Sequence, residues 1–427
     1  MKRILLVLLT SILVKNAAAQ FSFSCAKNTT IDCSQNCVTL QTTIPDIHTF
    51  SDDYGVSLIS GPGGCFRPPV NPGTPGVSTN LSLDDRYTPT IPLPFLFSFY
   101  GIYYLQCTVN TNGIISFDLT NSSTNAQWII QGLDGSLPST DYDRAIIMGA
   151  FHDIDISRPE SPTRQIKYDV LGTAPHRKWV LSFYKVPCFD CNNEIDNTYQ
   201  ITLYEGLSLV EVHVFARDVC TTWNAGAAMI GMQNYNQNSG VMAPGRSAFT
   251  TPRWQGPTMN EAWRFTPKQG PSLFKKVELT DLSGTVVATG TTAPGTNNDI
   301  AVTFDNICPA ATTTYLVKSS YYNLEYPFQF PARDSIIYGI DTITVYKNGS
   351  IPALNVSTTP AVCGPNPNGT INIAAPVGPN YEYSIDGGTN YQPGNSFSVL
   401  PGTYTVTIHD ITGTCTKDTT VIVGSPA

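Results

Sequence analysis

The sequence predicts an all-β, multidomain protein in which one large β-sandwich is followed by small Ig-like β-sandwich modules. Short stretches of alternating apolar and polar residues recur along the chain with turn residues between them, and no segment shows a convincing helical period. Charged residues make up only 13% of the 427 residues, about half the usual share, whereas Gly, Pro and Tyr are abundant. That composition is typical of turn-rich β modules, and the chain is too long for a single core.

Residues 1–19 have the features of a signal peptide. Lys2 and Arg3 give a basic start, residues 4–14 form an apolar run, and three alanines at 17–19 precede Gln20. The run is too short for a permanent span and no other stretch comes close, so we favour cleavage over an uncleaved anchor and expect no stable membrane span. The mature chain is therefore predicted to be exported.

The longest series of strand-like segments lies between Asp84 and Pro267. Residues 106–117 are typical of strand, turn and strand, and Ala145–Phe151 is a continuous apolar run typical of a buried strand. This series predicts one large β-sandwich. The other regions are predicted to be a cysteine-containing N-terminal extension packed on that sandwich (20–83), an Ig-like β-sandwich (271–347) and a small set of alternating strands (353–424).

All eleven cysteines lie after the predicted cleavage point, so disulfides are the default interpretation, and an odd count leaves at least one thiol unpaired. We expect Cys363 to pair with Cys415, because these residues flank the last set of strands. Cys220 is expected to pair with either Cys188 or Cys191. The Cys188–Cys191 spacing also occurs in redox motifs, but no βαβ unit surrounds it and no second pair completes a zinc site.

Ordered motifs in the large block carry a first resemblance. The stretches Asn112–Phe117, Ala150–Asp155, Trp179–Phe183 and Asn197–Tyr204 follow one another as in the nidogen-type extracellular domain, which residues 84–267 resemble. The resemblance implies a β-sandwich that acts outside the cell.

A second resemblance lies in residues 353–424. Cys363–Ile373, Tyr381–Gly388 and Phe397–Asp410 resemble the SprB-type repeat of secreted surface proteins of gliding Bacteroidetes, whose repeats are spacers in adhesive filaments. In addition, residues 220–226 and 261–267 resemble the heads of Bacteroidetes surface proteins that end in a gliding-associated or type IX secretion sorting domain. Such a domain implies the secretion machinery as a partner. Because the chain stops at Ala427 directly after the repeat, we expect it to be a fragment of a longer product.

The most suggestive polar cluster follows the buried strand at residues 145–151. In an extended chain Asp153 and Asp155 share a face, and their carboxylates are candidate calcium ligands, with Asp141 and Asp143 as further donors. Calcium needs six or more oxygens, and loop aspartates commonly cap turns instead. We favour turn capping, and keep calcium as the alternative.

Nothing in the sequence points to catalysis. It contains no Gly-x-Ser-x-Gly elbow and no His-Glu-x-x-His helix, and a net charge of −8 without a basic run argues against nucleic acid. We expect a non-enzymatic adhesin or adhesive-filament head, secreted or on the exterior of the outer membrane, that binds an extracellular glycan or protein. The alternatives are a carbohydrate-binding accessory region of a larger secreted enzyme and a structural spacer.

Overall fold

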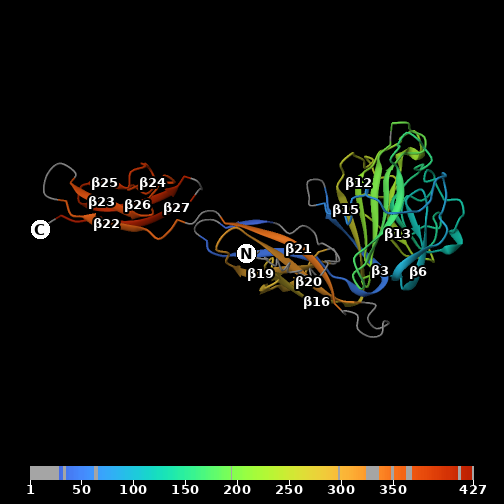
Figure 1. Cartoon of the computed structure of the whole chain (residues 1–427), viewed down its shortest axis with the longest axis horizontal. Helices are drawn as coiled ribbons and strands as arrows, with labels where there is room; N and C mark the ends of the chain where they lie inside the picture. The colour runs from blue at the N-terminus through green and yellow to red at the C-terminus, as the bar shows by residue number, and fades with distance from the viewer. Residues whose placement is uncertain are drawn as a thin grey trace, which may run out of the picture.

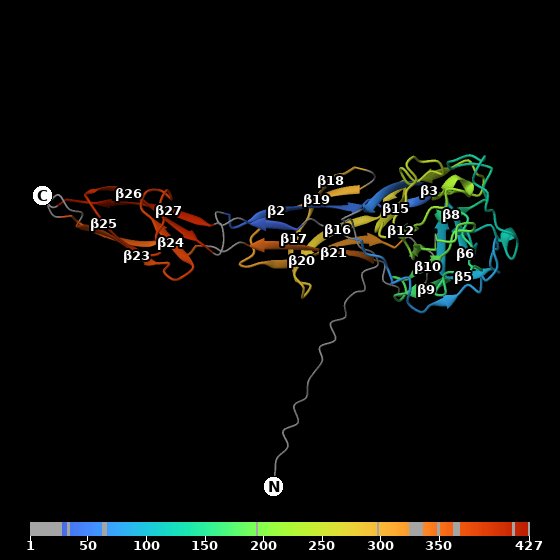
Figure 2. The same cartoon turned by 90° about the horizontal axis from the view of Figure 1, so that it is seen from above.

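The computed structural model shows three β units in a row (Figures 1 and 2). It describes residues 28–31, 35–61, 66–193, 195–296, 299–323, 336–347, 351–361, 368–411 and 415–425. Strands and two short 3-10 segments make up the regular structure of these ranges, without an α-helix, which confirms the predicted all-β multidomain fold. No helix in the described ranges is long and apolar enough to cross a membrane. The predicted signal peptide lies outside them.

The large unit is a sandwich of two sheets. Its seven-stranded sheet has the order β3-β15-β12-β11-β10-β9-β4, and its six-stranded sheet has the order β14-β13-β8-β7-β6-β5. The bounds are β3 (His48–Ser60), β4 (Val77–Ser78), β5 (Ile91–Phe99), β6 (Ile102–Val109), β7 (Ile114–Ser116), β8 (Ile146–Phe151), β9 (Gln165–Leu171), β10 (Lys178–Val186), β11 (Asn197–Tyr204), β12 (Val210–Ala216), β13 (Met229–Gln233), β14 (Gly240–Met242) and β15 (Glu261–Ser272).

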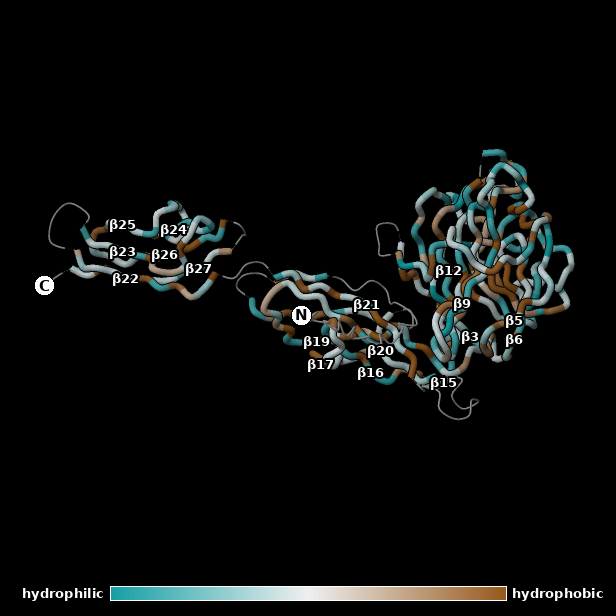
Figure 3. The backbone as a smooth tube through the Cα atoms, viewed as in Figure 1, coloured by the Kyte–Doolittle hydropathy of each residue, from teal (hydrophilic) through white to brown (hydrophobic). Residues whose placement is uncertain are grey.

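Alternate side chains of both sheets build the core of the large sandwich. On β5 the odd positions, among them Leu93, Phe95 and Phe97, point inward and are buried, as the period of two requires. Phe183 of β10 stacks on Tyr199 of β11 with 4.6 Å between ring centroids. Figure 3 shows the apolar segments gathered inside this unit.

The strand β8 is buried on both of its faces. One face joins the main core, and the other, with Ile146 and Met148, belongs to a second cluster that includes Ile130 and Tyr142 from the β7–β8 connection. Every residue of β8 is therefore inaccessible, which explains why its sequence is continuously apolar instead of alternating.

The middle unit is a sandwich that takes strands from two distant parts of the chain. Its sheets have the orders β1-β21-β20-β16-β17 and β18-β19-β2. The bounds are β1 (Thr29–Ile31), β2 (Val38–Pro45), β16 (Phe274–Thr280), β17 (Val286–Thr289), β18 (Thr291–Pro294), β19 (Asp299–Ile307), β20 (Thr313–Tyr322) and β21 (Ile336–Lys347).

The N-terminal region, expected from sequence to be an extension over residues 20–83 packed on the large sandwich, is divided between two units. β1 pairs in parallel with β21, and β2 pairs antiparallel with β19, where a Cys37–Cys308 disulfide joins the two segments. β3 instead pairs with β15 in the large sandwich. The difference arises because β1 and β2 pair with strands in the second half of the chain. Local sequence patterns carry no information on such distant pairing.

The large sandwich is thus inserted into the middle one. The chain enters through β3 and leaves through β15, and these strands stay paired until Ser272 lies opposite His48. The connection between β11 and β12 places the buried side chains of Leu207 and Leu209 in the core of the middle sandwich, which also contains Tyr321. Two strands and a shared apolar contact therefore couple the units.

The third unit contains two three-stranded sheets, β22-β23-β25 and β24-β26-β27, around a small core with Ile371, Tyr383 and Val406. Cys415 is disulfide-bonded, whereas its expected partner Cys363 lies outside the described residues. The bounds are β22 (Asn355–Thr359), β23 (Gly369–Ala375), β24 (Tyr381–Ser384), β25 (Ser396–Val399), β26 (Gly402–Asp410) and β27 (Thr416–Val423).

Candidate functional site

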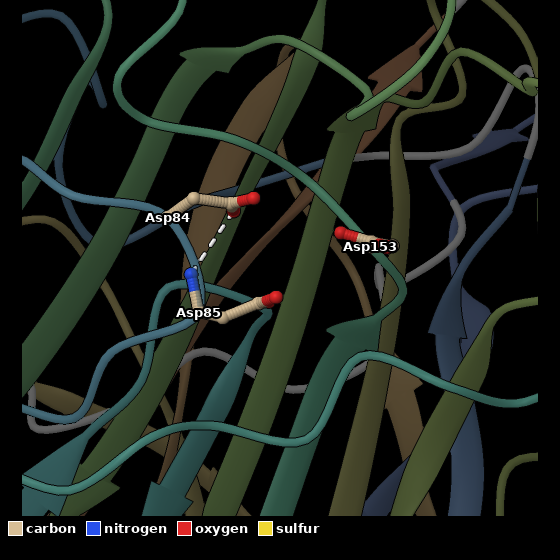
Figure 4. A group of neighbouring side chains, drawn as sticks. All are labelled: Asp84, Asp85 and Asp153. Carbon is tan, nitrogen blue, oxygen red and sulfur yellow. Dashed lines mark hydrogen bonds between the residues drawn. The ribbon is translucent and has the colours of Figure 1, made fainter.

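Three aspartates from two separate segments meet at one end of the large sandwich. Asp84 and Asp85 lie in the segment between β4 and β5, and Asp153 follows β8. One carboxylate oxygen from each lies within 4.8 Å of those of the other two. Figure 4 shows the three side chains turned toward the space between them.

Asp153 is held by the loops that pack on the end of β8. Its backbone oxygen accepts from Phe189 N at 3.2 Å, and its Oδ2 accepts from Trp223 Nε1 at 2.6 Å. The Trp223 ring stacks on Trp128 at 5.6 Å and packs at a tilt against Phe189 at 5.0 Å between ring centroids. The other oxygen of Asp153, Oδ1, is buried and has no hydrogen-bond partner.

Asp84 and Asp85 are fixed by a tight turn of the backbone. Asp85 has a φ of 48°, in the left-handed region that aspartate tolerates better than most residues. The Asp84 Oδ1 accepts from the Asp85 amide at 3.0 Å, and the Asp85 Oδ1 accepts from Asn112 Nδ2 at 2.8 Å. Asn112 also accepts from the Ile154 amide through its Oδ1, at 3.2 Å, and so links this turn to the segment that carries Asp153.

Burial and mutual repulsion disfavour a negative charge on all three carboxylates at once. Burial raises the pKa of Asp153 to about 8, against the hydrogen bond from Trp223, and repulsion from Asp85 and Asp84 adds to the shift. Burial and repulsion from Asp85 raise the pKa of Asp84 to about 7. Burial also raises the pKa of Asp85, although the hydrogen bond from Asn112 opposes the rise. The cluster therefore favours either bound protons or a bound cation at neutral pH.

The other aspartates considered as ligands do not belong to this group of three. Asp155 is buried but is not one of the three that meet; its Oδ1 caps a turn by accepting from Ser157 N at 2.7 Å. Asp141 Oδ2 accepts from Asp134 N at 2.7 Å, and Asp143 Oδ2 accepts from the Tyr87 hydroxyl at 2.6 Å. Turn capping, the interpretation favoured from sequence, describes Asp155, whereas Asp141 bonds a backbone amide seven residues earlier in the chain.

Asp84 and Asp85 were not predicted from the sequence. The adjacent pair of acidic residues just before a predicted strand was the available signal, but nothing local indicates that it meets Asp153, about 70 residues further along the chain. The contact depends on the sandwich topology, which brings the β4–β5 connection to the end of β8.

Two grooves flank the segment that precedes the acidic pair. The first has a volume of about 510 Å³ and the second about 370 Å³, and they share Ser78, Leu81 and Ser82. Leu83 and Arg86, the neighbours of the acidic pair, line the first groove, and Ile156, the neighbour of Asp155, lines the second. Hydroxyls, Asn80, Arg86 and the ring of Tyr168 give the first groove both hydrogen-bonding and aromatic groups.

A third hollow of about 630 Å³ lies along the segment that covers the outer face of the seven-stranded sheet. Its lining combines prolines and aromatic rings, among them Pro68, Pro69 and Phe215, with polar side chains such as Lys185 and Asp196. It shares no lining residue with the first two grooves, and none of its lining residues is a neighbour of Asp84, Asp85 or Asp153 in the sequence.

The cysteines of the large sandwich play a structural part. Of the two alternatives expected from sequence, the structure pairs Cys220 with Cys191, while Cys188 is buried and not disulfide-bonded. The bridge fixes the loop that carries Trp223, three residues after Cys220, against the loop that carries Phe189. It thereby supports the hydrogen bond from Trp223 to Asp153.

Comparison with known proteins identifies the large sandwich. No curated protein matches the chain. Residues 63–270, however, match the family model described as NIDO related. This range covers the grooves, the three aspartates and the strands of the large sandwich from β4 to all but the last two residues of β15. The chain therefore contains a nidogen-related extracellular β domain.

Proposed function

We propose that this chain is an exported, non-enzymatic adhesive protein of the cell surface, with the nidogen-related sandwich as its ligand-binding head. The observation that carries the proposal is that the domain matching this extracellular family also holds the grooved surface around Ser82. This unit lies at one end of the row, and the β22–β27 unit lies at the other (Figure 1). The middle and terminal units would hold the head away from its anchorage.

The disulfides support an extracellular setting, because such bonds persist in oxidising compartments. The resemblances of residues 220–226, 261–267 and 353–424 extend the proposal to the outer-membrane exterior of a gliding bacterium, with export through type IX secretion. The non-enzymatic part is supported by the positions of His152 and His213: both are buried, and neither lines either groove.

The lining of the first groove favours a second candidate, a carbohydrate-binding accessory region. Side-chain hydroxyls, Asn80 and Arg86 can hydrogen-bond sugar hydroxyls, and Tyr168 offers a ring face for an apolar sugar face. This candidate shares the binding surface with the adhesin and differs from it in requiring a polysaccharide ligand.

A binding screen separates these functions. The intact, disulfide-bonded chain would be labelled and applied to arrays of polysaccharides and of extracellular proteins. Saturable binding to a protein or a cell-surface glycan supports the adhesin, and binding confined to storage or cell-wall polysaccharides supports the accessory region. If the chain binds nothing on either array, a structural spacer becomes the supported function. Release of cleaved products from an array would contradict the non-enzymatic assignment.

A further inference from the structure

We propose that Asp84, Asp85 and Asp153 form a calcium-binding site that ties the groove-lining β4–β5 segment to the end of β8. Two observations carry the proposal: the geometry of the carboxylates and the unsatisfied buried oxygen of Asp153. Repulsion among the carboxylates supports it.

The geometry leaves one oxygen of each carboxylate available. Asp84 and Asp85 each use Oδ1 to accept a hydrogen bond, and Asp153 uses Oδ2 to accept from Trp223. Each of the three residues therefore keeps one carboxylate oxygen that accepts no hydrogen bond from the described residues. Figure 4 shows that the three side chains converge. A cation among them could take three protein oxygens without breaking any of these hydrogen bonds.

The buried oxygen of Asp153 points to a missing partner. The residue is only 6% exposed, and its Oδ1 has no hydrogen-bond partner, although buried polar atoms are paired as a rule. An unpaired carboxylate oxygen is costly to bury because a charged group loses its hydration there. A metal ion would satisfy it.

The charge balance favours a cation at the same place. Asp155 lies close enough to add to the repulsion on both Asp84 and Asp153. Arg86 opposes the rise in the pKa of Asp85, but its side chain is exposed and donates to Asn125. A divalent ion would convert the repulsion between three carboxylates into attraction.

The chemistry of the three donor atoms favours calcium over zinc and magnesium. All three donors are carboxylate oxygens, which suit hard cations, and no histidine or thiol belongs to the group, as a zinc site would favour. Asp84 and Asp85 are half-buried, so water can complete the coordination from their side. Calcium accepts such irregular, partly hydrated shells of six to eight oxygens more readily than magnesium, which demands near-ideal octahedral geometry.

The site would organise the first groove. Leu83 and Arg86 line that groove and flank the acidic pair directly, so a bound ion would fix them relative to β8. Dependence of ligand binding on calcium rests on the function proposed above, whereas the calcium site itself does not. Calcium binding and its effect on the fold can therefore be measured without any ligand.

The test is calorimetric titration of CaCl₂ into the intact, disulfide-bonded chain after divalent ions have been removed. We expect saturable binding with a dissociation constant of about 10⁻⁴ to 10⁻³ M, the range of extracellular modules, and weaker binding of MgCl₂. Asp153→Asn should weaken calcium binding by at least about tenfold, because one of three charged ligands is lost. Asp190→Asn makes the same charge change at an aspartate outside the cluster and should bind as the unmodified chain does.

Thermal unfolding distinguishes loss of the ion from loss of the fold. Calcium should raise the unfolding midpoint of the unmodified chain and of Asp190→Asn but not of Asp153→Asn. In chelator, Asp153→Asn should unfold no earlier than the unmodified chain, since it removes a repelling charge. If Asp153→Asn does not fold, Asp84→Asn serves in its place. The proposal is overturned if calcium produces neither heat nor a midpoint shift up to about 10 mM, well above the expected dissociation constant, or if the substituted chain responds like the unmodified one.

Discussion

Arg264 and Glu211 form a buried ion pair between neighbouring strands of the seven-stranded sheet. They are Cα partners on β15 and β12, and Arg264 Nε donates to Glu211 Oε1 at 2.8 Å. Both side chains are almost fully buried, and Tyr204 donates to the second oxygen of Glu211. The pair stands where the head meets the middle sandwich, because Tyr204 belongs to the core that the two units share.

Removing one partner of this pair should destabilise the head strongly. Arg264→Met leaves the Glu211 carboxylate buried without its cation, and breaking a buried pair in this way costs about 3–5 kcal/mol of unfolding free energy. The double variant Glu211→Leu with Arg264→Met should recover much of the loss. Urea unfolding followed by tryptophan fluorescence measures both variants. Equal stability of Arg264→Met and the unmodified chain would show that the pair contributes nothing.

A second prediction concerns pH and His213. Burial lowers the pKa of His213 to about 4, with Arg264 and Lys178 acting in the same direction and Glu211 opposing them. Between about pH 6.5 and pH 4 the unfolded chain binds a proton at this residue and the folded chain does not. The unfolding free energy should therefore fall as pH decreases through that window, by up to about 1.4 kcal/mol per pH unit from this one group.

The variant His213→Gln isolates this contribution. Unfolding free energies of both chains at pH 7 and pH 4.5 give two slopes. Carboxylates distant from His213 contribute equally to each slope, whereas Glu211, whose Oε2 lies 3.8 Å from His213 Nε2, is part of the difference. The variant should lose less stability on acidification than the unmodified chain. Parallel slopes would mean that His213 is protonated in the folded state or that its burial has no effect on its titration.

A third prediction compares the two disulfides. Cys37–Cys308 closes a loop of 271 residues and Cys191–Cys220 a loop of 29. If each bond acts mainly by restricting the unfolded chain, replacing the first pair by serines should cost about 2 kcal/mol more than replacing the second. Thermal unfolding of the two double-serine variants tests this. An equal or smaller loss for Cys37→Ser with Cys308→Ser would show that strain or residual structure decides the outcome.

The sequence predicted the all-β fold and several individual strands, but not the contacts between distant segments. The period of two at Leu93, Phe95 and Phe97 and the apolar run Ile146–Phe151 are local signals, and each corresponds to a strand of the large sandwich. Two contacts depend on the topology, which local periodicity does not encode. They are the pairing of β2 with β19 and the meeting of Asp84 with Asp153. Asp153 could be singled out from sequence, whereas its partners required the fold.

The central claim, that the nidogen-related head binds an extracellular ligand through its grooves, is tested most directly by one affinity titration. The intact chain, Ser82→Trp and Asn236→Trp would each be titrated against the strongest ligand from the binding screen. Ser82 is exposed and lines both grooves, so the indole would obstruct them, whereas Asn236 is an exposed turn residue that lines neither. We predict that Ser82→Trp weakens binding by at least about tenfold, or about 1.4 kcal/mol, while Asn236→Trp binds as the unmodified chain does. Unchanged affinity of a folded Ser82→Trp chain would contradict the claim.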